Sequence, residues 1–315
     1  MLKRALRAGG ASGEKVFVAT INHFEYGWIT PALSYALSVL GSFLGLICAG
    51  RIRTAHTGGQ RAWWGILAAW AIGGTAIWTM HFMAMLGFGV EGTRIRYDVP
   101  LTVASAVTAV AAVGIGLAIV GTGRLSAVRI IVGGVFTGAG VAAMHYTGMA
   151  AMRLNGDLVY DRTRVVLSVA IAVAAATVAL WLAVTVRRLL ALVGSALVMG
   201  VAVNGMHFTG MSALSVHLHD RQGRLSGAGV STLLVPIVLA VIFVVVGLVY
   251  ALLAAPTEED RAGAAYLDTR REPFPATAEP GTPPDPAGLR AHSARTTLGQ
   301  PGGTPFPRRR DDSPR

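Results

Sequence analysis

Residues 126–152 read SAVRIIVGGVFTGAGVAAMHYTGMAAM, an apolar run that is long enough to cross a lipid bilayer as one helix. A helix of roughly 17 to 25 apolar residues spans the hydrocarbon core. Similar runs recur along the chain, and the predicted spans are residues 28–50, 63–88, 99–120, 126–152, 165–186, 189–214 and 231–254. Because a lipid-exposed backbone must satisfy its own hydrogen bonds, the sequence predicts an all-α fold, a polytopic transmembrane bundle of about seven helices.

The composition supports a membrane protein. Hydrophobic residues make up 53% of the 315-residue chain and charged residues 14%, whereas a soluble domain carries about a quarter charged residues. The net charge of +11 is spread over predicted loops and the tail, so it does not indicate nucleic-acid binding. We expect a multi-pass protein of the cell membrane, with the lipid bilayer as its partner. Charge leaves the orientation open, because arginines occur in the loops on both sides.

The two ends of the chain differ from the membrane region, residues 26–254. Residues 1–25 contain basic residues but no apolar core directly after them, so we expect an uncleaved N-terminal extension. Residues 255–315 hold eleven of the fourteen prolines and few aliphatic residues. Such a segment buries too little surface to offset its ordering entropy, which predicts a disordered tail.

A tetrapeptide within the quoted run recurs in two other spans. MHYT at residues 144–147 is matched by MHFM at 80–83 and by MHFT at 206–209, and the histidines are 64 and 62 residues apart. A period of that size holds about two membrane crossings and two short loops. The membrane region therefore consists of repeated helix pairs, with three histidines at equivalent points of one bundle.

Each histidine has the same helical neighbours. A methionine four residues later shares its helix face, and a glycine seven residues earlier, at Gly74, Gly138 or Gly200, lies two turns before it on that face. Small residues allow close helix approach in lipid, so we predict that the histidine faces point toward one another. The candidate metal ligands are His81, His145, His207, Met80, Met85, Met144, Met149, Met206 and Met211.

Imidazole and thioether groups form a soft to borderline donor set. This set suits copper, particularly Cu(I), better than zinc, magnesium or calcium. An ionisable group inside a membrane usually has a function, although a tandem duplication can also copy a structural Met-His pair. His23 precedes the first span at the same membrane face and is a further candidate ligand. For His23, and for His217 and His219 in a loop on that side, the default is a solvated or interfacial histidine.

Polar residues near the motifs also need partners inside the membrane. Thr147 and Thr209 follow two of the histidines and are expected to bond to a carbonyl one turn back. Asn204 lies one turn before His207, and its amide must find a partner in the bundle. Two roles stay open for Asn204: it orients His207, or it forms an interhelical hydrogen bond unrelated to a metal.

At these motifs the chain resembles the MHYT-domain family of bacterial integral-membrane proteins, over roughly residues 26–254. Only residues 144–147 read MHYT literally, since Phe208 replaces the tyrosine in the third copy and Phe82-Met83 ends the first. The resemblance implies six or seven spans in the bacterial cytoplasmic membrane, with the motifs near its outer face and the C-terminus inside. It also implies a sensor whose Met and His residues bind copper, which senses a diatomic gas such as oxygen, CO or NO.

Many members of that family continue into a cytoplasmic output domain, such as a diguanylate cyclase, a phosphodiesterase or a kinase. After residue 255 this sequence holds no phosphate-binding loop and no cyclase or kinase signature. We therefore expect a protein that is not itself an enzyme and that signals through a separate cytoplasmic output protein. Two other classes stay open: a haem- or copper-containing redox protein, and a copper-handling transporter.

Overall fold

The computed structural model describes residues 17–22, 25–219, 225–255, 263 and 266–267. Seven helical segments in these ranges are long and apolar enough to cross a membrane, which confirms the predicted all-α bundle. The predicted tail lies outside the described residues except for Ala255 and three helical positions. The spanning helices are α1 (Ile29–Thr54), the continuous segment α2 (Gly58–Ala69), η1 (Trp70–Thr79) and α3 (Met80–Leu86), then α4 (Val99–Gly121), α5 (Ala127–Ala150), α6 (Arg162–Thr185), α7 (Leu189–Ser212) and α8 (Val230–Leu253).

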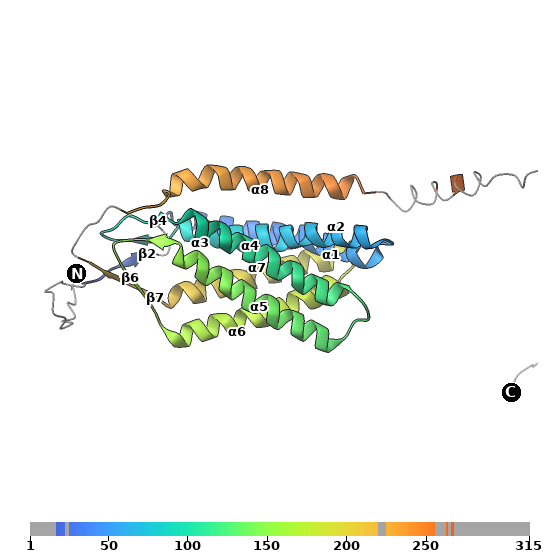
Figure 1. The fold of residues 1–315 in the computed structure, drawn as a ribbon, viewed down its shortest axis with the longest axis horizontal. Coiled ribbons are helices and arrows are strands. Elements are labelled where there is room, and N and C mark those ends of the chain that lie inside the picture. The colour runs from blue at the N-terminus through green and yellow to red at the C-terminus, as the bar shows by residue number, and fades with distance from the viewer. Residues whose placement is uncertain (1–16, 23–24, 220–224, 256–262, 264–265, 268–315) are drawn as a thin grey trace, which may run out of the picture. The chain divides into compact units, whose positions relative to one another are not determined.

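The helices that carry the histidines alternate with helices that cover them. The helix α4 packs against η1 and α5, α6 packs against α5 and α7, and α1 packs against α7, η1 and α3. The structural repeat is therefore a covering helix followed by a motif helix: α1 with the second span, α4 with α5, and α6 with α7. The last span, α8, lies at the periphery (Figure 1) and contacts α1 and η1 with a small part of its surface.

The second span contains a π-helical segment directly before its motif. In η1 the hydroxyl of Thr79 donates to the carbonyl of Gly74, five residues back, at 2.9 Å. A π-helix turns less per residue than an α-helix, because its hydrogen bonds run over five residues. The two-turn relation predicted between Gly74 and His81 is therefore wrong in this repeat.

Glycines allow close packing of the motif helices, but against the covering helices. A Cβ at Gly138 would overlap the backbone of Val173 in α6, and one at Gly200 would lie 2.7 Å from the side chain of Val39 in α1. In the second span Gly73 replaces Gly74 in this role, since a Cβ there would lie 2.7 Å from the carbonyl oxygen of Ala109. The prediction of close approach is confirmed for Gly138 and Gly200, with a different neighbour from the one expected.

Short strands cap the end of the bundle at which α3, α5 and α7 terminate (Figure 1); we call it the sheet end. We expected polar loops here. The strands were not predicted, because segments of two to five residues are too short to show an alternating pattern. Part of the predicted N-terminal extension contributes two of these strands. The antiparallel pairings join β1 (Phe17–Val18) and β6 (Gly156–Tyr160) to β7 (Leu214–Leu218), β2 (Ile21–Asn22) to β3 (Gly89–Val90), and β4 (Arg96–Tyr97) to β5 (Met152–Arg153).

Two covering helices begin with the same acidic cap at the sheet end. The carboxylate of Asp98 accepts the amide of Leu101 at 3.1 Å, and that of Asp161 accepts the amide of Arg164 at 2.9 Å. Asp98 also accepts a hydrogen bond from Arg153 at 2.8 Å. This bond, together with the cap, holds the pKa of the Asp98 carboxyl below its ordinary value.

Candidate metal centre

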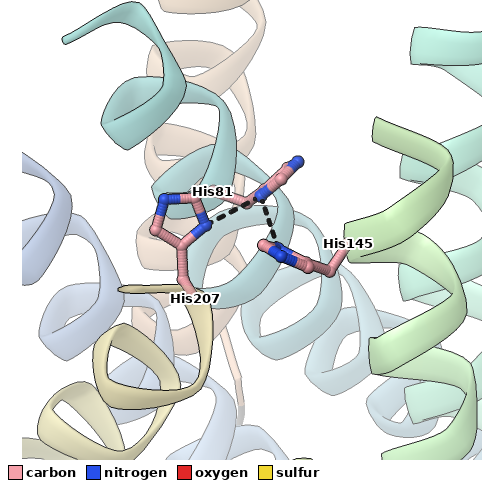
Figure 2. Close-up of side chains that lie close together, drawn as sticks. All are labelled: His81, His145 and His207. Atoms are coloured by element: carbon pink, nitrogen blue, oxygen red, sulfur yellow. Dashed lines mark hydrogen bonds between the residues drawn. The ribbon is translucent and has the colours of Figure 1, made fainter. Parts of the chain in front are cut away.

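The three repeated histidines meet in the interior of the bundle. His81 lies in α3, His145 in α5 and His207 in α7, each five residues before the end of its helix. At a rise of about 1.5 Å per residue the three therefore lie at the same depth, about 7.5 Å from the helix ends. All three are at most 2% exposed, and Figure 2 shows their rings pointing toward one another. The predicted convergence of the three histidines is confirmed.

The imidazole rings form a nearly equilateral triangle. Their centroids lie 4.9 Å (His81–His145), 5.0 Å (His81–His207) and 5.2 Å (His145–His207) apart, with each pair edge to face. The Nδ1 atom of His81 lies 3.0 Å from Nδ1 of His207 and 3.2 Å from Nδ1 of His145 (Figure 2). One nitrogen of each ring thus faces the same small volume.

Neutral imidazoles alone satisfy this arrangement poorly. A neutral ring nitrogen carries either one proton or one lone pair, so Nδ1 of His81 cannot form a full hydrogen bond with both neighbours at once. A cation between the rings would accept all three lone pairs. Metal–nitrogen bonds of about 2.0–2.1 Å place the nitrogen ligands about 3.3–3.6 Å apart. The observed separations therefore require the rings to open by only a few tenths of an ångström, roughly, and the cluster fits a metal ion.

The position three residues after the histidine is a feature that the sequence reasoning missed. A Cβ on Gly148 would overlap Nε2 of His81, and a Cβ on Gly210 would overlap Nε2 of His145. Each of these rings thus lies against the glycine of the following motif helix. The first repeat has Ala84 at the equivalent position. The small residue three positions after each histidine was a signal in the sequence. Its role could not be predicted, because it depends on which helix packs beside it.

The six predicted methionine ligands are all buried, at no more than 3% exposure. Those four residues after a histidine pack in a cluster at the sheet end that also contains Phe82 and Tyr97. Met144 and Met206, which precede their histidines, pack in the larger core of the bundle. The methionines therefore lie on both sides of the histidine layer, and their service as ligands stays a prediction.

The other predicted polar residues have different environments. His23 lies outside the described residues. His219 pairs with Asp157 at 3.0 Å, and His217 belongs to β7, so neither joins the cluster. Asn204 accepts a hydrogen bond from Ser34 in α1 at 3.0 Å and donates to the carbonyl of Gly200, which is the interhelical alternative. The expected bond of Thr209 to a carbonyl one turn back, that of Gly205, is confirmed.

An apolar cavity of about 340 Å³ lies on the other side of the histidine layer from the strands. Its walls include Ile77 and Val141, each four residues before a motif histidine, and Met206, which directly precedes His207. Its polar side chains are Ser42 of α1 and Thr137 of α5. This cavity was not predictable from the sequence, because its walls come from six different helical segments.

The chain matches the family model MHYT, described as "Bacterial signalling protein N terminal repeat", at residues 74–133, 138–196 and 200–266. Each matched segment begins in a motif-bearing span and includes the whole of the next span. The model therefore repeats three times with the period that the histidines show. No solved structure matches the chain.

Curated relatives match over the membrane region. The chain is 38% identical over 228 residues to the bifunctional diguanylate cyclase/cyclic di-GMP phosphodiesterase MucR of Pseudomonas aeruginosa, covering 69% of this chain and 33% of that protein. It is 35% identical over 190 residues to the cyclic di-GMP phosphodiesterase NbdA of the same organism, covering 58% and 24%. For the signaling protein YkoW of Bacillus subtilis the identity is 30% over 202 residues, covering 62% and 25%. The chain thus spans a quarter to a third of these relatives.

Proposed function

This chain belongs to the MHYT family of bacterial signalling proteins, and from that premise we propose that it is a membrane sensor whose three-histidine cluster binds copper. The observation that carries the proposal is the convergence of Nδ1 atoms from His81, His145 and His207, within the interior of a membrane bundle. An ionisable cluster at this depth is costly without a function.

The donor set favours copper over other metals. Three imidazoles would hold the ion, and the methionines on both sides of the histidine layer would supply thioether ligands, which select Cu(I) over harder cations. Among the described residues no Asp or Glu belongs to the cluster. Copper held there would supply an electron-rich centre able to bind a small gas such as oxygen, CO or NO. Because Gly148 and Gly210 have no side chain, they leave room for the rings of His81 and His145 at these positions.

The arrangement of the rings favours a metal ion over haem. The ring centroids lie only 4.9–5.2 Å apart and the rings touch edge to face. A macrocycle bound between two of these rings would need them on opposite faces of its iron, with a gap that this triangle does not have. A haem role would therefore require a different arrangement of all three helices.

We place the sheet end at the outer face of the membrane and the opposite end in the cytoplasm. Arginines occur in the loops at both ends and do not decide the orientation, so this placement rests on the resemblance to the MHYT family, which implies motifs near the outer face. A change in the cluster would shift the motif helices against the covering helices. Since MucR and NbdA are named as cyclic di-GMP enzymes, the proposed partner is a cytoplasmic output protein of that kind.

Metal analysis of the purified protein tests the proposal. Wild-type protein reconstituted with Cu(I) is expected to retain about one copper per chain, and His145→Ala to lose it because the triangle loses one corner. His219→Ala, outside the cluster, is the matched control and should retain copper. An infrared C–O stretching band after CO addition, absent from the His145→Ala protein, would support gas binding. Full copper content in the triple alanine variant of His81, His145 and His207 would overturn the proposal.

A further inference from the structure

One face of α1 carries a hydroxyl at every fourth position. We call this set the α1 hydroxyl row; its members are Thr30, Ser34, Ser38 and Ser42. Residues four apart are neighbours on the helix surface, so the members form a continuous row that is inclined by about 26° to the helix axis. Thr30 is 8% exposed and the three serines are fully buried. The row therefore faces the interior of the bundle over about 18 Å of helix.

Three members of the row lack a hydrogen-bond partner among the described residues: Thr30, Ser38 and Ser42. A serine or threonine in a membrane helix ordinarily bonds to a carbonyl of the preceding turn, as Thr108, Thr177 and Thr209 do elsewhere in this bundle. Leaving a buried hydroxyl unpaired costs free energy. Three unpaired hydroxyls in one line indicate a ligand for all of them rather than three independent defects.

The spacing of the row fits water. Consecutive members are separated by about 6 Å along the helix, too far for a direct hydroxyl–hydroxyl bond. Two water molecules, linked to each other and to the hydroxyls by hydrogen bonds of about 2.8 Å, bridge such a gap. Ser34, the remaining member, donates to Asn204, which lies one turn before His207. A file of bridging waters along the row would therefore pass beside the histidine cluster.

Both ends of the row open into cavities. Thr30 lines a cavity of about 840 Å³ at the sheet end, whose walls include the charged residues Glu25 and Arg94 and the exposed Tyr26. Ser42 lines the apolar cavity of about 340 Å³ below the histidines. The wall of the first cavity is exposed and charged and can take up water, whereas the second is almost entirely aliphatic. Water is thus expected to enter from the sheet end and to end at Ser42.

The other covering helices do not share this feature. Ser105 in α4 is hydrogen-bonded to Trp78 and Thr102, and Ser168 in α6 to Tyr146 and Val165. Four residues after each serine stand Ala109 and Ala172, so the hydroxyls do not continue toward the bilayer centre. The extended row is specific to α1.

We propose that the α1 hydroxyl row binds a file of water molecules that connects the sheet-end cavity with the interior of the bundle. The site requires no metal, so it stands apart from the copper proposal.

Water-edited solid-state NMR of serine-labelled, full-length protein in lipid bilayers tests this proposal. Polarisation transfer from water to the Ser38 and Ser42 side chains, assigned with single alanine variants, is expected to be several-fold faster than to Ser105 and Ser168. The last two are equally buried serines with protein partners, so they are matched controls. Ser38→Val should interrupt the file and slow the transfer to Ser42 alone.

Transfer to Ser38 and Ser42 that is no faster than to the two controls would overturn the proposal. Fast transfer to Ser42 that persists in Ser38→Val would overturn the continuous file. If that variant fails to fold, the comparison of the four serines in the wild-type protein still decides. Copper content measured on the same sample is independent of this result, so loss of copper binding and absence of water are distinguishable outcomes.

Discussion

The motif helices and the covering helices of this bundle repeat with very different fidelity. The helices α3, α5 and α7 place His81, His145 and His207 in a triangle with nearly equal sides. The covering helices occupy equivalent places, yet α4 and α6 begin with an aspartate cap, while α1 begins after Trp28 without a side-chain cap and carries the hydroxyl row. The central cluster is symmetric, and its surroundings are not.

This difference indicates that metal binding and access to solvent place different demands on the helices. Binding an ion between three rings demands the same ring position from each repeat, so the motif helices tolerate little variation. The proposed route to solvent needs only one polar face, and among the described covering helices the row of unpaired hydroxyls occurs in α1. Substitutions that displace a motif histidine should therefore weaken or abolish metal binding, whereas substitutions on covering helices should change stability and leave metal binding intact.

The largest effect is expected for Gly210→Ala. Its Cβ would overlap Nε2 of His145, so the ring must move out of the triangle. We expect copper binding to weaken by about 10- to 100-fold and overpacking to destabilise the protein by about 1–3 kcal/mol. Metal titration and denaturant unfolding measure the two effects. Gly205→Ala in the same helix, where a Cβ meets nothing within 4 Å, is the control; equal behaviour of the two variants would contradict the ring placement.

A smaller effect is expected where a motif helix meets α1. Ser34 and Asn204 share a buried hydrogen bond of 3.0 Å, and such bonds between membrane helices contribute about 0.6 kcal/mol on average and at most about 1.7 kcal/mol. A double-mutant cycle with Ser34→Ala and Asn204→Ala should give a coupling energy in that range, with copper content unchanged in Ser34→Ala. A coupling energy of zero would show that this hydrogen bond does not stabilise the packing of α1 against α7.

The smallest effect is expected at the caps of the covering helices. The pKa of Asp98 is lowered in the folded protein, so its contribution to stability is present above its unfolded pKa of about 3.9 and is lost as the pH falls through the folded value. Asp98→Asn should therefore lower the unfolding midpoint at neutral pH and match the wild type in strong acid.

Asp161→Asn is the matched control for this pH dependence. It removes the charge from the equivalent cap of α6, whereas of the two capping residues only Asp98 receives a hydrogen bond from Arg153. The difference between the two variants measures the Arg153 interaction, which is expected to be small because the pair is exposed. A larger loss in Asp161→Asn would contradict this assignment.

Much of the fold was predictable because bilayer thickness fixes the length of an apolar run. All seven spans were predicted, and the convergence of the histidines followed from the repeat period. The π-helical segment was not predicted, since nothing in residues 70–79 shows that the helical period changes there. It moved the packing glycine of the second span from Gly74 to Gly73.

The surroundings of the cluster were less accessible to sequence reasoning. The contact of His81 with Gly148, and of His145 with Gly210, depends on which helix follows which around the bundle. The hydroxyl row has a plain signal, a hydroxyl at four positions spaced by four in α1, but polar residues in a helix gain meaning only when their partners are known. The two- to five-residue strands leave too short a pattern to recognise.

The central claim, that the three histidines form one copper centre, is tested most directly by copper X-ray absorption on the purified, Cu(I)-loaded protein. We expect a nitrogen shell from three imidazoles at about 2.0 Å, together with a sulfur contribution at longer distance. His145→Ala should lose one nitrogen from that shell or lose the copper altogether. A spectrum without imidazole ligands, or one that is identical in the wild type and in His145→Ala, would contradict the claim.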